Sequence, residues 1–422
     1  MVPLEQARAL ALDSIDIGRA VQTPLAAAHG RFLAEPLRAP RSLPNFDNSA
    51  MDGYALRSSD TRGGNRDRPA RLRLVETIYA GALPSRPIRQ GEVCRIFTGA
   101  PVPDGADCVV RQEAARQEGE QVLVFVEASA GANIRRKGEE VAEGDLILPA
   151  GQMLNAYTIG LFASLGVQSV SAWPAPTVAI LTLGDELVPA GKPARPHQVF
   201  DCNGPLLSAL CGEIGASVTA SEHAPDEEGP LIDAVQRLAP QADVLITSGG
   251  ASAGDKDLIK RTLRALGAAI ALDGVAMKPG KPAGVAILHG GPVVILPGNP
   301  GAAAVAFDQL ARPMLFKRQG VVETRQSVRA KLGAAQHKQA GLTYLLSARL
   351  QRGERAPPTA IVRPQGAGQL LQNVHADGWI TLPRGQADFS EGEEVWMELF
   401  AGATFAAVAA GPGHGHQSGD SP

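Results

Sequence analysis

The amino-acid sequence predicts a multidomain α/β protein, in which an α/β/α domain is accompanied by a β-rich inserted domain, a helical domain and a small C-terminal β domain. The chain has 422 residues, which is more than one compact core usually holds. Three apolar runs rich in Val, Ile and Leu each end in a glycine-rich loop, as strands of a buried parallel sheet do. Other β-type runs are short and are separated by Gly and Pro.

Two helical segments flank the β-rich region. Residues 1–45 begin with apolar residues at helical spacing, and residues 146–176 contain the helical run AYTIGLFASLGV. Between them lie the β-type runs RLRLVETIYAG, EVCRIFTGA, CVVRQE and VLVFVEA. We therefore expect a helical linking domain made of residues 1–45 and 146–176, with a β-rich domain of residues 46–145 inserted into it.

The remainder of the chain divides into an α/β part and a β part. Residues 177–327 alternate strand and helix patterns, which is typical of an α/β domain. The runs SVRAKLG, TYLLSARL, AIVRP and EEVWMELF predict a β domain over residues 328–406. Residues 407–422 are rich in Gly, His and Ser, and we expect this tail to be disordered.

Three loops of the α/β domain are expected to meet. They end the runs TVAILTLGDEL, DVLITSGGASAGD and VVILPGNPG, and helix patterns begin near Asn203, Leu258 and Pro300. In such a sheet, ligands bind beyond the carboxyl ends of the strands. The candidate ligand-binding residues in these loops are Ser248, Gly249, Gly250, Ser252, Gly254, Pro297, Gly298 and Asn299.

The second loop contains Gly250-Ala251-Ser252-Ala253-Gly254, which matches the G-x-S-x-G pattern of a hydrolase nucleophile elbow. An elbow needs its serine on a sharp strand-to-helix turn, whereas Ser252 follows the apolar run by several residues. The histidines His289 and His375 are also poorly placed to act as its base. We therefore favour a loop whose backbone N–H groups hold an anion.

Charged residues surround these loops. Asp185 and Glu186 follow the first apolar run, and Asp255 and Asp257 follow the second. Lys278 and Lys281 lie in the Pro- and Gly-rich stretch AMKPGKPAG. Carboxylates suit Mg²⁺, which prefers oxygen ligands and bridges to phosphate, and lysines suit phosphate or another oxyanion. Each of these residues taken alone could instead be a solvated charge at the edge of a sheet.

The composition of the chain argues against nucleic acid and membrane as binding partners. Forty Lys and Arg against 43 Asp and Glu give a net charge of −3, which does not support nucleic-acid binding. No apolar run approaches the roughly 20 residues of a membrane span, and the N-terminus lacks a signal core, so we expect a cytoplasmic protein. Cys94, Cys108, Cys202 and Cys211 are scattered and are expected to be reduced core thiols.

Seven stretches resemble the MoeA/gephyrin E-domain family, the molybdopterin molybdenumtransferases. They appear in the family order over roughly residues 5–325, and the region 328–405 matches only weakly. The stretches are PNFDNSAMDGYAL, IFTGAPVPDGADCVVRQE, NIRRKGEEVAEGDLILPAG, LTLGDELV, SGGASAGDKD, KPGKP and LPGNPGAA.

This resemblance implies a fold and a reaction. The fold would have an α/β/α domain like that of the molybdopterin adenylyltransferases, a β-rich insert and a C-terminal β barrel. The chain would form a homodimer, with a site shared between subunits, and would work with the molybdopterin adenylyltransferase and downstream cofactor-handling proteins. The reaction would take adenylylated molybdopterin and molybdate, use Mg²⁺ and release AMP.

The resemblance also implies roles for residues that match the family motifs. Catalytic positions would be Asp52, Thr98, Glu140, Glu186, Asp226 and Asp257, and the metal would be held by Asp52, Glu186 and Asp257. Arg135, Lys278, Lys281 and Pro282 would join the glycine loops in binding the substrates.

Three positions depart from the family pattern. Gly274 stands where a basic residue is common, Ser347 where an arginine is expected, and Ala367 where a serine is expected. These departures leave two interpretations open. The chain is either the molybdenum-inserting enzyme or a non-catalytic molybdopterin-binding paralogue. A serine hydrolase is a more distant third.

Overall fold

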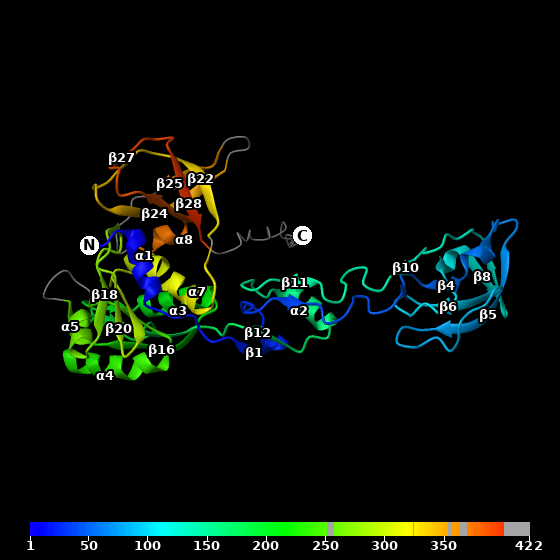
Figure 1. The fold of residues 1–422 in the computed structure, drawn as a ribbon. Coiled ribbons are helices and arrows are strands. Elements are labelled where there is room, and N and C mark those ends of the chain that lie inside the picture. Colours follow the sequence, from blue (N-terminus) through cyan, green and yellow to red (C-terminus); the bar gives the residue numbers. More distant parts are fainter. Residues whose placement is uncertain (251–256, 324, 353–356, 363–368, 401–422) are drawn as a thin grey trace, which may run out of the picture. The chain divides into compact units, whose positions relative to one another are not determined.

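The computed structural model describes residues 1–250, 257–323, 325–352, 357–362 and 369–400 (Figure 1). Contacts divide the chain into two units. The first comprises Met1–Gly18 together with the chain from Ala175 onward, and the second comprises Arg19–Pro174. Each unit has its own buried hydrophobic clusters.

The first unit contains a mixed six-stranded sheet in the order β16-β13-β17-β21-β20-β18. The first four strands are parallel, and β20 runs antiparallel to both of its neighbours, β21 and β18. β20 and β21 form a hairpin whose turn includes His289. The three apolar runs therefore form adjacent parallel strands, as predicted. The strands are β13 (Thr177–Leu183), β16 (Ser217–Ala224), β17 (Val244–Ser248), β18 (Ala269–Asp273), β20 (Gly284–Leu288) and β21 (Gly291–Leu296).

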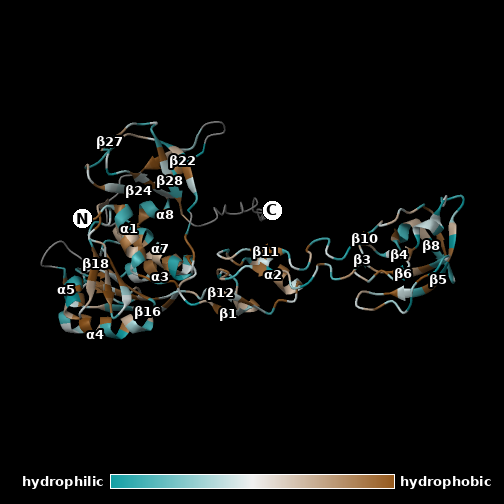
Figure 2. Cartoon of the chain, viewed as in Figure 1, coloured by the Kyte–Doolittle hydropathy of each residue, from teal (hydrophilic) through white to brown (hydrophobic). Residues whose placement is uncertain are grey.

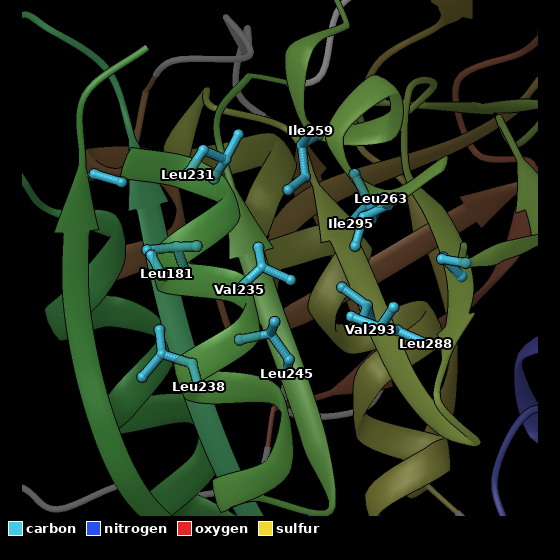
Figure 3. Packing of buried hydrophobic residues seen from close by; sticks show 14 of the residues in the cluster. Leu181, Leu231, Val235, Leu238, Leu245, Ile259, Leu263, Leu288, Val293 and Ile295 are labelled. Carbon is cyan, nitrogen blue, oxygen red and sulfur yellow. The ribbon is translucent and has the colours of Figure 1, made fainter. Parts of the chain in front are cut away.

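Helices cover both faces of this sheet. Helices α4 (Glu228–Leu238) and α5 (Leu258–Ala265) lie on one face, where Leu181, Leu245 and Ile295 of the strands pack against Leu231 and Leu263 (Figure 3). Hydrophobic and hydrophilic residues mix along α4, as expected of a helix with one face on a sheet (Figure 2). The other face carries α3 (Asn203–Glu213), α6 (Pro300–Ala306) and α7 (Arg312–Arg318).

The C-terminal β domain is a closed five-stranded barrel. Its strands follow the order β24-β25-β22-β28-β26, and a further pairing of β24 with β26 closes the ring. The short strand β19 (Met277–Lys278) of the α/β domain pairs in parallel with the start of β24. The barrel strands are β22 (Ser327–Leu332), β24 (Thr343–Gln351), β25 (Thr359–Val362), β26 (Gly378–Leu382) and β28 (Glu394–Leu399).

The second unit is β-rich. Its six-stranded sheet has the order β7-β4-β6-β5-β9-β8, and alternate residues of β4 enter two different buried clusters, so both faces of the sheet are covered. The strands are β4 (Gly53–Leu56), β5 (Ala70–Ile78), β6 (Glu92–Ile96), β7 (Cys108–Arg111), β8 (Ala115–Glu118) and β9 (Gln121–Val124).

The region predicted as a helical linking domain contains less helix than expected. Helix α2 (Ala156–Ser164) is the only α-helix of Arg19–Pro174, a stretch that the structure describes completely. Around α2 lie two-stranded ladders instead of a helical pair, because the Pro-rich sequence after residue 20 favours extended backbone. The ladders join β1 (Val21–Pro24) to β12 (Ser169–Ala172), and β2 (Leu37–Arg38) to β11 (Leu146–Leu148).

Helix α1 (Leu4–Asp13) belongs to the other unit. The prediction grouped it with residues 146–176, whereas it packs on β18, α7 and the π-helical turn η5 (Phe307–Ala311). Its buried face consists of Leu4, Ala7 and Ala11. The apolar spacing predicts such a face, but it does not say which neighbour the face covers.

The cysteines largely follow the prediction. Cys94, Cys108 and Cys211 are buried free thiols, and burial raises the pKa of each to about 12. Cys202 differs, because it is exposed next to the start of α3.

Candidate active site

Two of the predicted loops are tied together at the carboxyl edge of the α/β sheet. The hydroxyl of Ser248, at the end of β17, donates to the carbonyl oxygen of Pro297 at 2.9 Å. The side-chain amide of Asn203 donates to the Ser248 hydroxyl at 2.9 Å and to the Gly298 carbonyl at 2.7 Å. Asn203 is buried and thus joins three segments of the edge. Its sequence neighbourhood indicated a helix start and gave no sign of this second role.

Glycines set the shape of the loop after β17. Gly249 has φ +100° and Gly250 has φ +62°, both in the left-handed region that favours glycine. An added Cβ at Gly249 would lie 2.3 Å from the carbonyl oxygen of Leu183, and one at Gly298 would lie 3.4 Å from the Cα of Gly249. A side chain at Gly249 would therefore clash with backbone, whereas a Cβ at Gly298 would make an ordinary van der Waals contact. Ser252, Gly254 and Asp255 lie outside the described residues, so the G-x-S-x-G stretch as a whole carries no structural argument.

Three carboxylates gather beside the end of β13. The backbone N–H of Asp226 donates to Asp185 Oδ1 at 3.0 Å, and the carboxylate of Glu186 folds back over Gly184. Partial loss of hydration raises the pKa of Asp226, and the charges of Asp185 and Glu186 raise it further. His223, which contacts the Gly184 carbonyl at 2.8 Å, opposes this rise. The cluster thus carries negative charge that a cation would relieve.

Asp257, predicted as a metal ligand, lies at the start of α5, and its role toward a metal stays a prediction. It caps α5, where its Oδ1 accepts from the backbone N–H of Lys260 at 3.3 Å. Its Oδ2 forms an ion pair with Lys260 Nζ at 2.8 Å, and Lys260 Nζ also pairs with Asp273 at 2.7 Å. Both carboxylate oxygens of Asp257 are therefore engaged within the protein.

A cavity of about 860 Å³ lies between the α/β edge and the barrel. It brings together six predicted site residues, which are Lys278, Lys281, Pro282, Pro297, Gly298 and Asn299. The barrel contributes residues that the sequence analysis did not select, including Gln336, Gln339, Tyr344 and Trp379. The sequence pattern predicts the strands of this domain but does not show which of their side chains face a cavity.

The structure describes two of the three positions that depart from the family pattern. Gly274 has φ +80° and is buried, so a basic residue there would be strained. Ser347 is 3% exposed on β24 and is the register partner of Trp379, but it does not line the cavity itself. Ala367 lies outside the described residues.

In the second unit, Asp52 and Thr98 form a pair. Asp52 Oδ1 accepts from the Thr98 backbone N–H at 2.8 Å and from the Thr98 hydroxyl at 2.7 Å. These two hydrogen bonds lower the pKa of Asp52, and Arg95 lowers it further by its charge. Asp52 is thus held as a carboxylate at neutral pH, in a defined orientation.

Arg135 and Glu140 line a separate cavity of about 500 Å³ in the same unit. The ladder between β3 (Asn48–Ser49) and β10 (Ile134–Arg135) places Arg135 opposite Asn48. Asn48 is buried and also lines the cavity, and its Oδ1 has no hydrogen-bond partner in the described part of the chain. The predicted positions Asp52 with Thr98, and Arg135 with Glu140, therefore form two polar groups of the second unit.

In the part of the chain that the structure describes, no three His, Cys, Asp or Glu side chains come close enough to hold a metal ion by themselves. No helix there is both long and apolar enough to cross a membrane.

Three family models cover most of the chain. The MoeA N-terminal region (domain I and II) matches residues 2–166. The probable molybdopterin binding domain matches residues 179–317, and the MoeA C-terminal region (domain IV) matches residues 329–400.

Similar proteins agree with these models. Molybdopterin molybdenumtransferase 2 of Mycobacterium tuberculosis is 36% identical over 385 residues, covering 88% of this chain and 91% of that protein. Molybdopterin molybdenumtransferase of Haemophilus influenzae is 32% identical, covering 95% and 99%. The crystal structure of a molybdopterin biosynthesis MoeA protein from Pyrococcus horikosii superposes with a TM-score of 0.82 at 29% identity, covering 96% and 100%. The chain therefore belongs to the MoeA family of molybdopterin molybdenumtransferases.

Proposed function

We propose that this protein inserts molybdate into adenylylated molybdopterin with release of AMP. The observation that carries the proposal is the 860 Å³ cavity at the sheet edge, in whose lining Lys278 and Lys281 are the only charged side chains that the structure describes. Both substrates are anions, and a cavity with lysines and without carboxylates attracts anions.

The residues of the chain have distinct parts in this proposal. Lys278 and Lys281 hold the oxyanion, since ammonium groups bind oxyanions as point charges. Because Gly249 and Gly298 have no side chains to cover the backbone, the N–H groups of their loops can approach a phosphate. Asp52, oriented by Thr98, and Arg135 with Glu140 supply the polar groups of the second unit.

The carboxylates beside β13 fit a Mg²⁺ ion in their chemistry. Mg²⁺ commonly takes one or two protein carboxylates and completes its shell with water and substrate phosphate, so a cluster of three acids is not needed. Glu186 and Asp226 offer such a pair. Loss of hydration, and then the charges of Asp185 and Glu186, raise the pKa of Asp226, and a cation would offset both effects. Asp257 would have to leave Lys260 first, and we omit it from this proposal. When bound, the ion would neutralise charge on the phosphate that departs with AMP.

Turnover tests the proposal directly. Purified full-length protein with adenylylated molybdopterin, Mg²⁺ and molybdate is expected to release AMP, and release should fall to background when molybdate is withheld. Chromatography of the nucleotide products measures both. If the protein binds adenylylated molybdopterin tightly but releases no AMP at any molybdate concentration, it is the non-catalytic binding protein instead, the alternative that Gly274 and Ser347 favour.

We also propose that the chain forms a homodimer through the segment around α2. This apolar helix buries only Phe162, while Tyr157 is 88% exposed, Met153 53% and Leu146 51%. Apolar side chains gathered in this way indicate a protein interface. A second copy is the expected occupant, because most soluble oligomers are symmetric assemblies of identical chains.

Sedimentation of Tyr157→Glu tests the dimer. A buried negative charge at a symmetric interface appears twice, so we expect the dimer dissociation constant to rise at least about tenfold. Leu83→Glu is the matched control, because Leu83 is 83% exposed outside this segment and should leave the dimer intact. A wild-type protein that sediments as a fully active monomer at nanomolar concentration would contradict the proposal.

A further inference from the structure

The barrel carries a buried lysine that has no carboxylate partner among the described residues. Lys338 is only 9% exposed, and its Nζ donates to the carbonyl oxygen of Leu342 at 2.9 Å. Its ammonium lies 5.4 Å from the ring centroid of Tyr344 and 5.9 Å from that of Phe389. Within the described ranges no ion pair involves Lys338, since the nearby Asp388 instead faces His337 at 2.8 Å. Loss of hydration accordingly lowers the pKa of Lys338.

A second buried lysine, Lys260, provides a comparison, because its ammonium group does have carboxylate partners. Lys260 is buried to a similar degree, but it forms ion pairs with both Asp257 and Asp273. Burying an unpaired charge costs free energy that a structural role alone would not justify. The described partners of the Lys338 ammonium are a carbonyl oxygen and two aromatic rings, none of which carries a full negative charge, so an anion bound nearby would compensate its charge.

The residues that Lys338 contacts point to the place where such an anion would bind. Leu342 and Tyr344, which Lys338 contacts, both line the 860 Å³ cavity. Lys278, on β19, is the register partner of Tyr344, and its ammonium lies 5.2 Å from the same ring centroid. The two ammonium groups are therefore no more than about 11 Å apart, a range over which charges still interact inside a protein.

We propose that Lys338 is a positioning residue of the oxyanion site, which strengthens binding of molybdate by Lys278 and Lys281 through its charge and by holding Tyr344 against Lys278. This inference rests on the proposed function for the identity of the anion. Lys338 would thus add a third positive charge to the site, next to Lys278 and Lys281, and this charge comes from the barrel.

Direct binding of molybdate to the full chain tests this inference without turnover. Isothermal titration at low ionic strength would compare wild type with Lys338→Met, Lys338→Arg and the exposed barrel control Lys331→Met. We expect Lys338→Met to weaken molybdate affinity about tenfold, and Lys338→Arg and Lys331→Met to stay within about threefold of wild type. Because a buried unpaired charge is removed, the thermal midpoint of Lys338→Met should not fall.

Two results would overturn the inference. One is wild-type molybdate affinity in Lys338→Met. The other is equal loss of affinity in the Met and Arg variants together with a lower thermal midpoint, which is what a purely structural lysine would produce. Failure of the proposed function is distinguishable, because a wild-type chain that binds molybdate but releases no AMP would leave the comparison among the variants valid.

Discussion

Glu186→Gln is expected to lower the rate of AMP release about a hundredfold while the protein remains folded. The substitution keeps the size of the side chain and removes one of the negative charges beside β13. Loss of a carboxylate from the shell of a catalytic ion typically costs several kcal/mol of transition-state stabilisation, and about 2.7 kcal/mol corresponds to a factor of a hundred. Steady-state AMP release at saturating Mg²⁺, with circular dichroism as the test of folding, measures the effect.

Asp226→Asn should lower the rate of AMP release about as much as Glu186→Gln does, and it should leave thermal stability unchanged or slightly raised. The pKa of Asp226 is raised in the folded state, so this carboxyl favours folding below its unfolded pKa and loses that contribution as the pH rises through its folded pKa. At pH 7 the ionised group therefore disfavours the folded state, and the asparagine variant should melt at the same temperature or slightly higher. Its difference from wild type should vanish near pH 4.

Asp233→Asn is the matched control for both variants, because Asp233 is an exposed acid on α4 in the same domain. It should retain wild-type turnover. Unchanged AMP release in Glu186→Gln would remove Glu186 from the site, and a lower thermal midpoint for Asp226→Asn at pH 7 would show that its charge is stabilised rather than strained.

Gly249→Ala is expected to abolish binding of adenylylated molybdopterin and to destabilise the protein. The left-handed backbone of Gly249 costs an alanine roughly 1–2 kcal/mol. The new methyl group would also lie 2.3 Å from the carbonyl oxygen of Leu183, so the loop has to move. Movement there separates the Ser248 and Pro297 segments, which form one edge of the site. Ligand titration and thermal melting measure the two effects.

Gly267→Ala is a control that introduces backbone strain without the steric clash expected for Gly249→Ala. Gly267 also has positive φ, at +82°, but an added Cβ there meets nothing within 4 Å. This control should lose stability by roughly 1–2 kcal/mol and keep full ligand affinity. If Gly249→Ala binds adenylylated molybdopterin as well as Gly267→Ala does, the loop does not approach the ligand as proposed.

Much of the α/β domain was predictable because its signals are local. Continuous Val, Ile and Leu runs identified β13, β17 and β21, since strands buried on both faces need no polar alternation. Pro300 after Asn299 marked the start of α6, and Gly267 follows the end of α5. Parallel pairing of the strands then placed their loops at one edge, which is why the predicted loop residues meet.

Other features depended on contacts between distant segments. The role of Asn203 arises from bonds to residues 45 and 95 positions away, and nothing near it in the sequence records them. Asp257 pairs with Lys260, which also pairs with Asp273, and this ion pair would compete with metal binding by Asp257. The sequence showed the apolar face of α1 but not the elements that this face packs against. The Pro-rich segment after residue 20 forms two-stranded ladders, although helix was expected there.

The sequence by itself determined the three buried parallel strands of the α/β core, the glycine loops and the family, because periodicity, backbone preference and motif spacing are all carried by neighbouring residues. Only the tertiary structure decided which charges have partners. Lys260 follows the apolar Ile259, and Lys338 lies between His337 and Gln339, but neither context shows a partner for the ammonium. Lys260 is nevertheless buried between two carboxylates, whereas Lys338 lies behind a cavity whose described lining contains none. Charge compensation acts through space, so it is set by folding and not by position along the chain.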